Sequence, residues 1–323
     1  MTDLRPGADT PSARTAHAGS PDRGPAPAGA DSPAARAGYA DPPPRMGFFT
    51  DTSVCIGCKA CEVACKEWNG VPDTGFDLLG LSYDNTGALT ANSWRHVAFI
   101  EQPAAPAPAP AAGRTQFLGM PGATPPGRDS TAPRTDFRWL MMSDVCKHCT
   151  EAACLDVCPT GALFRTEFST VVVQEDICNG CGYCVSACPY GVIDKRAGDG
   201  RAWKCTLCYD RIGAGMTPAC AQACPTESIQ YGELDELRRR ADERLAHLRD
   251  AGVSSAQLYG HDPGDGVGGD GAFFLLLDEP EVYGLPPDPV VTTRDLPKMW
   301  RRAGLAALAM AAATVAAFVG GRP

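Results

Sequence analysis

The stretch that decides the fold reads Cys178-Asn-Gly-Cys181-Gly-Tyr-Cys184-Val-Ser-Ala-Cys188-Pro189, and its cysteines are spaced CxxCxxCxxxCP. Three more groups of four cysteines occur along the chain. They are Cys55, Cys58, Cys61 and Cys65; Cys146, Cys149, Cys154 and Cys158; and Cys205, Cys208, Cys220 and Cys224. Together the four groups use all 16 cysteines, so no thiol is left over.

This spacing is that of bacterial ferredoxins, in which three cysteines of a run bind one 4Fe-4S cluster and the fourth binds another cluster. Two intervening residues let successive thiolates reach adjacent corners of one cluster, while backbone N–H groups of the loop point at the sulfurs. Sixteen thiolates in four groups therefore predict four 4Fe-4S clusters. Four clusters in one chain predict a relay for single electrons.

The ferredoxin rule also predicts which cysteines bind each cluster, once the groups are paired. The adjacent second and third groups are expected to exchange their fourth cysteines, and so are the first and fourth groups. The predicted ligands are Cys55, Cys58, Cys61 and Cys224 for cluster 1; Cys65, Cys205, Cys208 and Cys220 for cluster 2; Cys146, Cys149, Cys154 and Cys188 for cluster 3; and Cys158, Cys178, Cys181 and Cys184 for cluster 4. The predicted fold is thus α+β, with two interleaved ferredoxin-like units.

Other chemistry has weaker support. Zinc sites normally group cysteines by twos, whereas four lie within eleven positions here. His148 is expected beside a cluster or at the surface, because four thiolates leave it no vacant position. Residues 264–271 are Gly-rich but precede a predicted strand, so they predict a flexible surface loop rather than a phosphate-binding loop. No nucleophile–base pair is recognisable, and we predict no catalytic residue.

Charge and cysteine usage exclude two further classes of protein. The net charge is −9 and no Lys/Arg-rich block occurs, which argues against a nucleic-acid partner. Repeated CxxC pairs are not the pattern of a secreted disulfide framework. Since cluster assembly needs free thiolates, maturation in a reducing cytoplasm is expected.

Composition divides the chain into segments. Residues 1–45 are rich in Pro, Ala and Gly and predict a disordered arm in which no export signal is visible. The four-cluster region is expected at 46–232, with strands near 94–100, 137–142 and 171–173 and a Pro/Ala-rich insertion at 103–134. An extension follows at 233–297, with an amphipathic helix over 233–248 and a strand over 272–277.

Residues 298–323 predict a membrane anchor. The run from 303 to 321 has no charged residue, and Lys298, Trp300, Arg301 and Arg302 precede it. An uncharged run of this length with flanking Trp and cations is typical of a transmembrane helix. A buried C-terminal helix is the alternative.

The order of the four cysteine groups resembles the four-cluster iron–sulfur subunits of molybdopterin oxidoreductases. Flanking motifs narrow the resemblance to the beta subunit of membrane-bound formate dehydrogenase, over residues 46–321. These motifs are Cys58-Lys-Ala-Cys61-Glu-Val-Ala-Cys65-Lys-Glu-Trp-Asn69, Ser93-Trp-Arg-His96, Tyr209-Asp-Arg211 and Gly284-Leu-Pro-Pro-Asp-Pro289.

The resemblance implies a non-catalytic subunit that receives electrons from a molybdenum or tungsten catalytic (alpha) subunit that oxidises formate. It implies delivery to a haem b membrane (gamma) subunit that reduces quinone, in the order cluster 1, 2, 3 and 4. Nitrate-reductase relatives have Trp at a third-group cysteine and a 3Fe-4S cluster there. Because Cys181 is intact here, four 4Fe-4S clusters are expected.

Two other functions stay open at this point. The first, which is closer to the expected electron-transfer role, is the iron–sulfur subunit of a membrane-bound hydrogenase or of another molybdopterin oxidoreductase. The second, which is less similar to that role, is a cluster- or zinc-stabilised binding module without redox function. The resemblance places the globular part on the outer face of the plasma membrane, whereas the cations before the anchor favour the inner face by the positive-inside rule.

Overall fold

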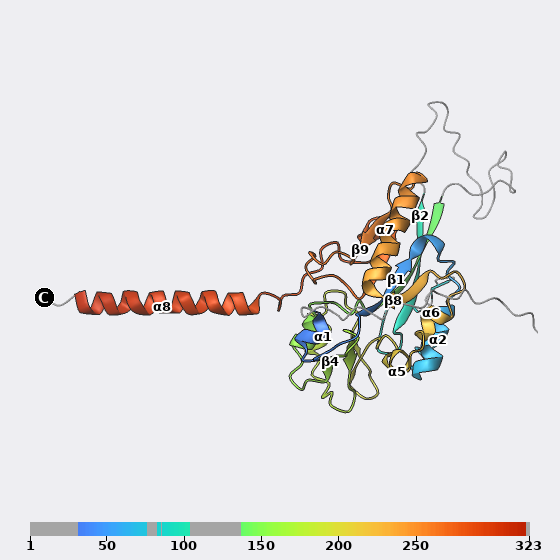
Figure 1. Cartoon of the computed structure of the whole chain (residues 1–323). Helices are drawn as coiled ribbons and strands as arrows, with labels where there is room; N and C mark the ends of the chain where they lie inside the picture. The colour runs from blue at the N-terminus through green and yellow to red at the C-terminus, as the bar shows by residue number, and fades with distance from the viewer. Residues whose placement is uncertain (1–31, 76–82, 85, 104–136, 321–323) are drawn as a thin grey trace, which may run out of the picture.

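The structure is a computed structural model, and it describes residues 32–75, 83–84, 86–103 and 137–320. Its centre is a four-stranded mixed sheet in the order β8-β1-β10-β9 (Figure 1). The strands are β1 (Met46–Asp51), β8 (Ile229–Glu233), β9 (Gln257–Tyr259) and β10 (Ala272–Leu276). Strand β1 pairs in parallel with β10 and antiparallel with β8, so segments far apart in sequence meet in one sheet.

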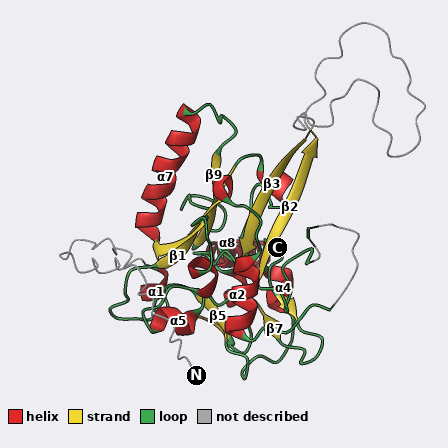
Figure 2. Cartoon of the chain, turned by 90° about the vertical axis from the view of Figure 1, so that its right-hand side faces the viewer, coloured by secondary structure: helices red, strands yellow, loops and turns green. Residues whose placement is uncertain are grey.

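Both faces of this sheet are covered. Successive side chains of a strand point to opposite faces, so Phe48 and Phe49 of β1 enter two different cores. Phe49 stacks on Phe273 of β10, with ring centroids 5.3 Å apart, under helix α7 (Leu234–Asp250). Phe48 faces the cysteine-rich side, where the short helices gather (Figure 2). The sheet therefore separates α7 from the cysteine groups.

The predicted helix over 233–248 and strand over 272–277 are confirmed by α7 and β10. Helix α7 ends at Asp250, and Gly252 follows it with φ of +89°. Because β9 and β10 join β1 in one sheet, the predicted extension at 233–297 shares its core with the preceding region and does not stand apart from it.

The cysteine-rich side consists of short elements. A long hairpin pairs β2 (Arg95–Pro103) with β3 (Phe137–Val145), as predicted at 94–100 and 137–142; the expected insertion after Pro103 lies outside the described residues. Two smaller hairpins pair β4 (Leu163–Arg165) with β5 (Val171–Val173) and β6 (Asp194–Lys195) with β7 (Ala202–Trp203). The remaining short elements are η1 (Thr52–Val54), α2 (Ala60–Asn69), α3 (Ala153–Asp156), α4 (Tyr183–Ala187), α5 (Tyr209–Gly213), α6 (Ala219–Gln222) and η2 (Pro280–Tyr283).

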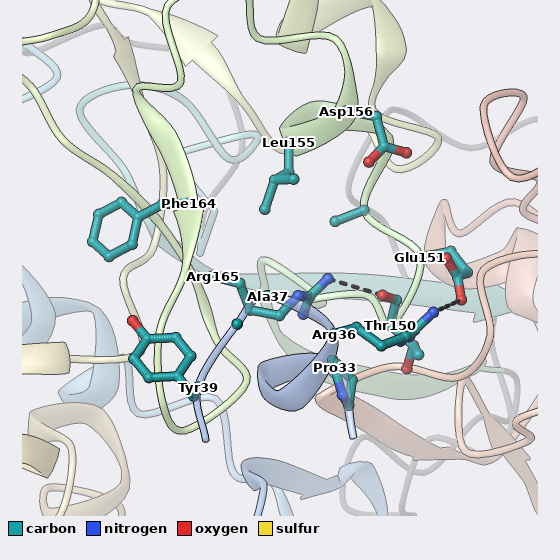
Figure 3. Close-up of a pocket in the computed structure, with 12 residues that line it drawn as sticks. Pro33, Arg36, Ala37, Tyr39, Thr150, Glu151, Leu155, Asp156, Phe164 and Arg165 are labelled. Carbon is teal, nitrogen blue, oxygen red and sulfur yellow. Dashed lines mark hydrogen bonds and ion pairs between the residues drawn. The ribbon is translucent and has the colours of Figure 1, made fainter. Parts of the chain in front are cut away.

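The prediction that residues 1–45 are disordered is wrong for residues 32–45. Residues 32–45 are folded onto the body, with α1 (Pro33–Arg36) capped by Ser32 and with Ala34 fully buried. Arg36 Nη1 pairs with Glu151 Oε1 at 2.8 Å, beside a surface pocket (Figure 3). One turn of helix could not be recognised by periodicity, because its stability comes from these contacts. Residues 1–31 lie outside the described residues.

The expectation of a flexible surface loop at 264–271 is wrong. Val267 and Asp270 are fully buried, and the loop pairs with the second cysteine group through Glu151 N to Val267 O at 2.8 Å and Thr150 N to Gly269 O at 3.0 Å. The glycines allow this approach. A Cβ at Gly271 would lie 3.0 Å from His148 O.

Helix α8 (Leu296–Gly320) extends away from the rest of the molecule (Figure 1). Lys298–Val319 is long and apolar enough to cross a membrane, and no part of its most apolar window is buried inside the protein. Leu308, Val315 and Phe318 are all exposed. The alternative of a buried C-terminal helix therefore does not describe this structure.

Candidate iron–sulfur centres

All 16 cysteines lie in the described ranges, and all are free thiols. Two cavities on the cysteine-rich side are lined by four of them each. Cys55, Cys58, Cys61 and Cys224 line one cavity. The lining of the other cavity includes Cys146, Cys149, Cys154 and Cys188. In both cavities the fourth thiol comes from a distant cysteine group.

The remaining eight thiols also fall into two neighbourhoods. Burial raises the pKa of the Cys65 thiol, and so do the nearby thiols of Cys205, Cys220 and Cys208. Burial likewise raises the pKa of Cys184 to about 11, together with the neighbouring thiols Cys178, Cys158 and Cys181. Cys65 thus lies near thiols of the fourth group, and Cys158 lies near a thiol of the third group.

The thiols surround volumes rather than converging on points. Within the described ranges, no three His, Cys, Asp or Glu side chains approach closely enough to hold a single metal ion. A zinc ion needs four ligands at about 2.0–2.3 Å from one centre, whereas a 4Fe-4S cluster places its four cysteines at the corners of a larger body. The donor set and its spread fit 4Fe-4S clusters.

A repeated backbone conformation shapes the four CxxC turns. The residue before the second cysteine has a positive φ in each turn: +65° at Gly57, +48° at His148, +72° at Gly180 and +58° at Leu207. This left-handed residue turns successive N–H groups toward the sulfurs, as in anion-binding backbone nests. Leu207 N, for example, donates to Cys205 Sγ at 3.2 Å. Such donors stabilise negative charge on a cluster and its thiolates.

Family models of two 4Fe-4S dicluster domains match residues 54–162 and 137–234. The chain is 36% identical over 274 residues to the nitrate-inducible formate dehydrogenase iron–sulfur subunit of Escherichia coli strain K12, covering 84% of this chain and 81% of that one. It is 37% identical over 246 residues to the formate dehydrogenase iron–sulfur subunit of Haemophilus influenzae, covering 75% and 68%. The B subunit of the anaerobic dimethyl sulfoxide reductase of E. coli is 33% identical over 201 residues, covering 62% and 79%.

The chain belongs to the formate dehydrogenase iron–sulfur subunit family. It is an electron-transfer subunit with 4Fe-4S domains, and its 16 cysteines are consistent with four clusters. The recognition made on the cysteine order and its flanking motifs is confirmed, and so is the non-catalytic role.

The residue that follows the last cysteine of each group of this iron–sulfur subunit affects where the helix ends. Proline follows Cys158, Cys188 and Cys224, and the helices before them end within two residues of the cysteine. Lys66 follows Cys65 instead, so α2 continues to Asn69. Asn69 Nδ2 lies 3.7 Å from Cys65 Sγ and 3.9 Å from Cys208 Sγ. The missing proline thus lets one helix carry a polar donor to two thiols.

Hydroxyl groups beside the thiols were not recognised in the sequence. Ser143 Oγ lies 3.2 Å from Cys61 Sγ. Thr160 and Thr226 lie 3.7 Å and 3.8 Å from Cys158 and Cys224, the thiols two positions before them. The repeated Cys-Pro-Thr motif could have indicated the two threonines, whereas nothing local marks Ser143.

His148 is buried and not at the surface. Its Nδ1 accepts a hydrogen bond from Val171 N at 3.1 Å. Burial and the nearby Lys204 hold its pKa well below the usual value, so the ring is neutral. Its place beside Cys149 agrees with the expectation of a residue next to a cluster rather than a ligand.

Burial of the thiols differs along the subunit. Cys58 of the first cavity and Cys181 of the third group are exposed. The neighbourhood formed by Cys65, Cys205, Cys208 and Cys220 is instead buried at every thiol. Apolar side chains flank both exposed thiols: Ile56 is 58% exposed and Tyr183 is 60% exposed. Two of the four neighbourhoods therefore have a thiol at the surface, and one has none.

Proposed function

We propose that this subunit relays electrons from a molybdopterin catalytic subunit that oxidises formate to a cytochrome b subunit that reduces quinone in the membrane. When bound, each 4Fe-4S cluster accepts and donates one electron. The chain supplies thiolates that hold the clusters, donors that stabilise their charge and a fold that spaces them. The homology to formate dehydrogenase iron–sulfur subunits over most of the chain carries this proposal.

The four ligand sets are Cys55, Cys58, Cys61 and Cys224; Cys65, Cys205, Cys208 and Cys220; Cys146, Cys149, Cys154 and Cys188; and Cys158, Cys178, Cys181 and Cys184, numbered sets 1 to 4. The thiols that line the two cavities support sets 1 and 3. The thiols that act on Cys65 and Cys184 support sets 2 and 4.

These sets make two interleaved ferredoxin-like units within 46–232. Strand β1, before the first cysteine group, pairs with β8, after the fourth group. Helix α2 of the first group also packs against α6 of the fourth. The second and third groups lie between them in sequence, and α3 packs against α4 there. One unit is thus inserted into the other.

Electrons enter at set 1 and leave at set 4. The exposure of Cys58 and Cys181 supports these ends, because an electron must pass to and from other subunits across short gaps. The exposed Ile56 and Tyr183 would be covered by those partners. The fully buried set 2 suits an internal step.

Helix α8 anchors the subunit in the plasma membrane, with the globular part on the outer face. Its exposed apolar length supports the anchor. The side of the membrane rests on the resemblance to exported formate dehydrogenases. Lys298, Arg301 and Arg302 would favour the opposite orientation, so protease accessibility in intact spheroplasts is the deciding measurement.

The test of the donor is co-purification from membranes with identification of the large subunit, followed by dye reduction with formate or hydrogen. Formate-dependent reduction with a molybdopterin subunit is the expected result. Hydrogen-dependent reduction with a nickel–iron subunit would contradict it. The similarity to the dimethyl sulfoxide reductase B subunit supports a second candidate, another molybdopterin oxidoreductase, but it covers only 62% of this chain.

A further inference from the structure

Two buried cations, Arg95 and Lys204, lie among the cysteines. Arg95 and Lys204 are each 2% exposed. Within the described ranges neither forms an ion pair with an aspartate or glutamate, in contrast to the buried Lys147, which pairs with Asp144. Burying a charge costs several kcal/mol unless another charge or hydrogen bonds compensate it. No carboxylate of the described residues supplies this compensation for Arg95 or Lys204.

Arg95 of β2 lies between ligand sets 1 and 2. Its Nη1 donates to Ser143 Oγ at 3.0 Å, and that hydroxyl lies 3.2 Å from Cys61 Sγ of set 1. Its Nη2 is buried and has no hydrogen-bond partner within the described protein. A guanidinium fixed in this way still has N–H groups to offer to an acceptor that is not part of the polypeptide.

The sulfur atoms near Arg95 belong to Cys220, Cys61, Cys205 and Cys65. Burial lowers the pKa of Arg95, whereas negative charge on these sulfurs, which cluster ligation requires, raises it. One of these cysteines belongs to set 1 and three belong to set 2. The guanidinium therefore acts on both sets.

Lys204 holds the equivalent position between sets 2 and 3. It directly precedes Cys205 of set 2, and its Nζ donates to Cys205 O at 2.9 Å and to Val171 O. Val171 also lines the cavity that contains Cys146 and Cys154. Cys146 and Cys154 belong to set 3. One ammonium group thus faces two consecutive ligand sets.

We propose that Arg95 and Lys204 compensate the negative charge of consecutive clusters and raise their reduction potentials, Arg95 for sets 1 and 2 and Lys204 for sets 2 and 3. A cluster with four thiolates carries a net negative charge, and reduction adds another. A nearby cation stabilises the reduced form more than the oxidised form, and burial strengthens the interaction. Set 2 is buried at all four thiols and is the set that both cations face, so it depends on them most. The assignment of the sets rests on the proposed ligand map.

The test is a redox titration of the purified complex, with dithionite and mediators, followed by electron paramagnetic resonance. We compare Arg95→Met and Lys204→Met, which remove the charge, with Arg95→Lys, which keeps it. Arg95→Met should lower the potentials of the clusters in sets 1 and 2, and Lys204→Met those in sets 2 and 3. The double variant should shift set 2 most, set 4 should stay unchanged, and Arg95→Lys should remain near the wild-type potentials.

Three results would overturn the proposal: unchanged potentials in both Met variants, an equal shift of all four clusters, or the same shift in Arg95→Lys as in Arg95→Met. If Arg95→Met assembles with less iron, the comparison moves to iron content. Retention of iron in Arg95→Lys then supports a role of the charge, and equal loss in both variants shows a steric role and contradicts it. Because dithionite replaces the physiological donor, a wrong assignment of formate would not alter these results. Spectra of Cys65→Ser and Cys224→Ser test the ligand map separately.

Discussion

Trp68 Nε1 donates a hydrogen bond to Asp210 Oδ2 at 2.8 Å, although 142 positions separate the two residues. The guanidinium of Arg211 lies over the same indole ring, 4.1 Å from its centroid. These contacts join α2, which carries Cys65, to α5, which follows Cys208. The motif that ends at Asn69 and the motif Tyr209-Asp-Arg211 therefore contact each other through these three side chains.

Trp68→Phe removes this hydrogen bond and keeps an aromatic ring for Arg211. We expect a loss of about 1 kcal/mol, which is the net value of a typical hydrogen bond. The measurement is the bleaching of visible absorbance in urea. Asp210→Ala should have a similar effect, and the double variant should lose little more, because both changes break one bond. If the two losses of stability simply add in the double variant, the hydrogen bond between Trp68 and Asp210 does not contribute to stability.

The ligand map is tested by two serine variants. Cys65→Ser should damage the cluster of Cys205, Cys208 and Cys220 and spare that of its sequence neighbours Cys55, Cys58 and Cys61. Cys224→Ser should do the reverse. Electron paramagnetic resonance of the two reduced variants should show different signals lost, and quinone reduction should fall steeply in both. Loss of the same signal in both variants would show that ligands are not exchanged between groups.

Two glycines with a similar backbone conformation are expected to respond differently to substitution by alanine. Gly57 and Gly161 have φ of +65° and +70°. A Cβ at Gly57 would lie 2.7 Å from both Met141 and Phe99, whereas a Cβ at Gly161 meets nothing within 4 Å. Gly161→Ala should cost only backbone strain, about 1–2 kcal/mol. Gly57→Ala should also displace Cys58 and reduce the iron content and the signal of the first cluster; equal iron content in the two variants would refute this reading.

Removal of α8 should release the subunit from membranes. Deletion from Lys298 onward takes no cysteine, because Cys224 is the last, so the iron content should stay unchanged. Expressed without its membrane partner, the shortened chain should move to the supernatant after ultracentrifugation. A full-length control with Ala307→Arg and Ala311→Arg should behave similarly, since each central Arg costs about 2.5–3.5 kcal/mol on insertion. Membrane retention of both variants would show that another surface binds the membrane.

Cluster chemistry made much of the site predictable. The spacing of Cys178, Cys181, Cys184 and Cys188 follows from the distance between corners of a cluster, so the signal lies in residues close together in the sequence. The strand Val171–Val173 and helix α7 were likewise found, because β-branched residues and a leucine period are local signals. His148 was predicted beside a cluster or at the surface, because four thiolates leave it no vacant ligand position, and only the structure showed that it is buried.

The sequence by itself therefore determined the cofactor type, the number of clusters and the family, because each depends on residues close together in the chain. Only the tertiary structure decided that Arg95 and Lys204 are buried, that residues 264–271 pack against the second cysteine group and that 32–45 fold onto the body. The contact of Ser143 with Cys61 was also decided by the tertiary structure, since 82 positions separate the two residues. Burial and charge compensation depend on which distant segments meet, and no local pattern of residues records that.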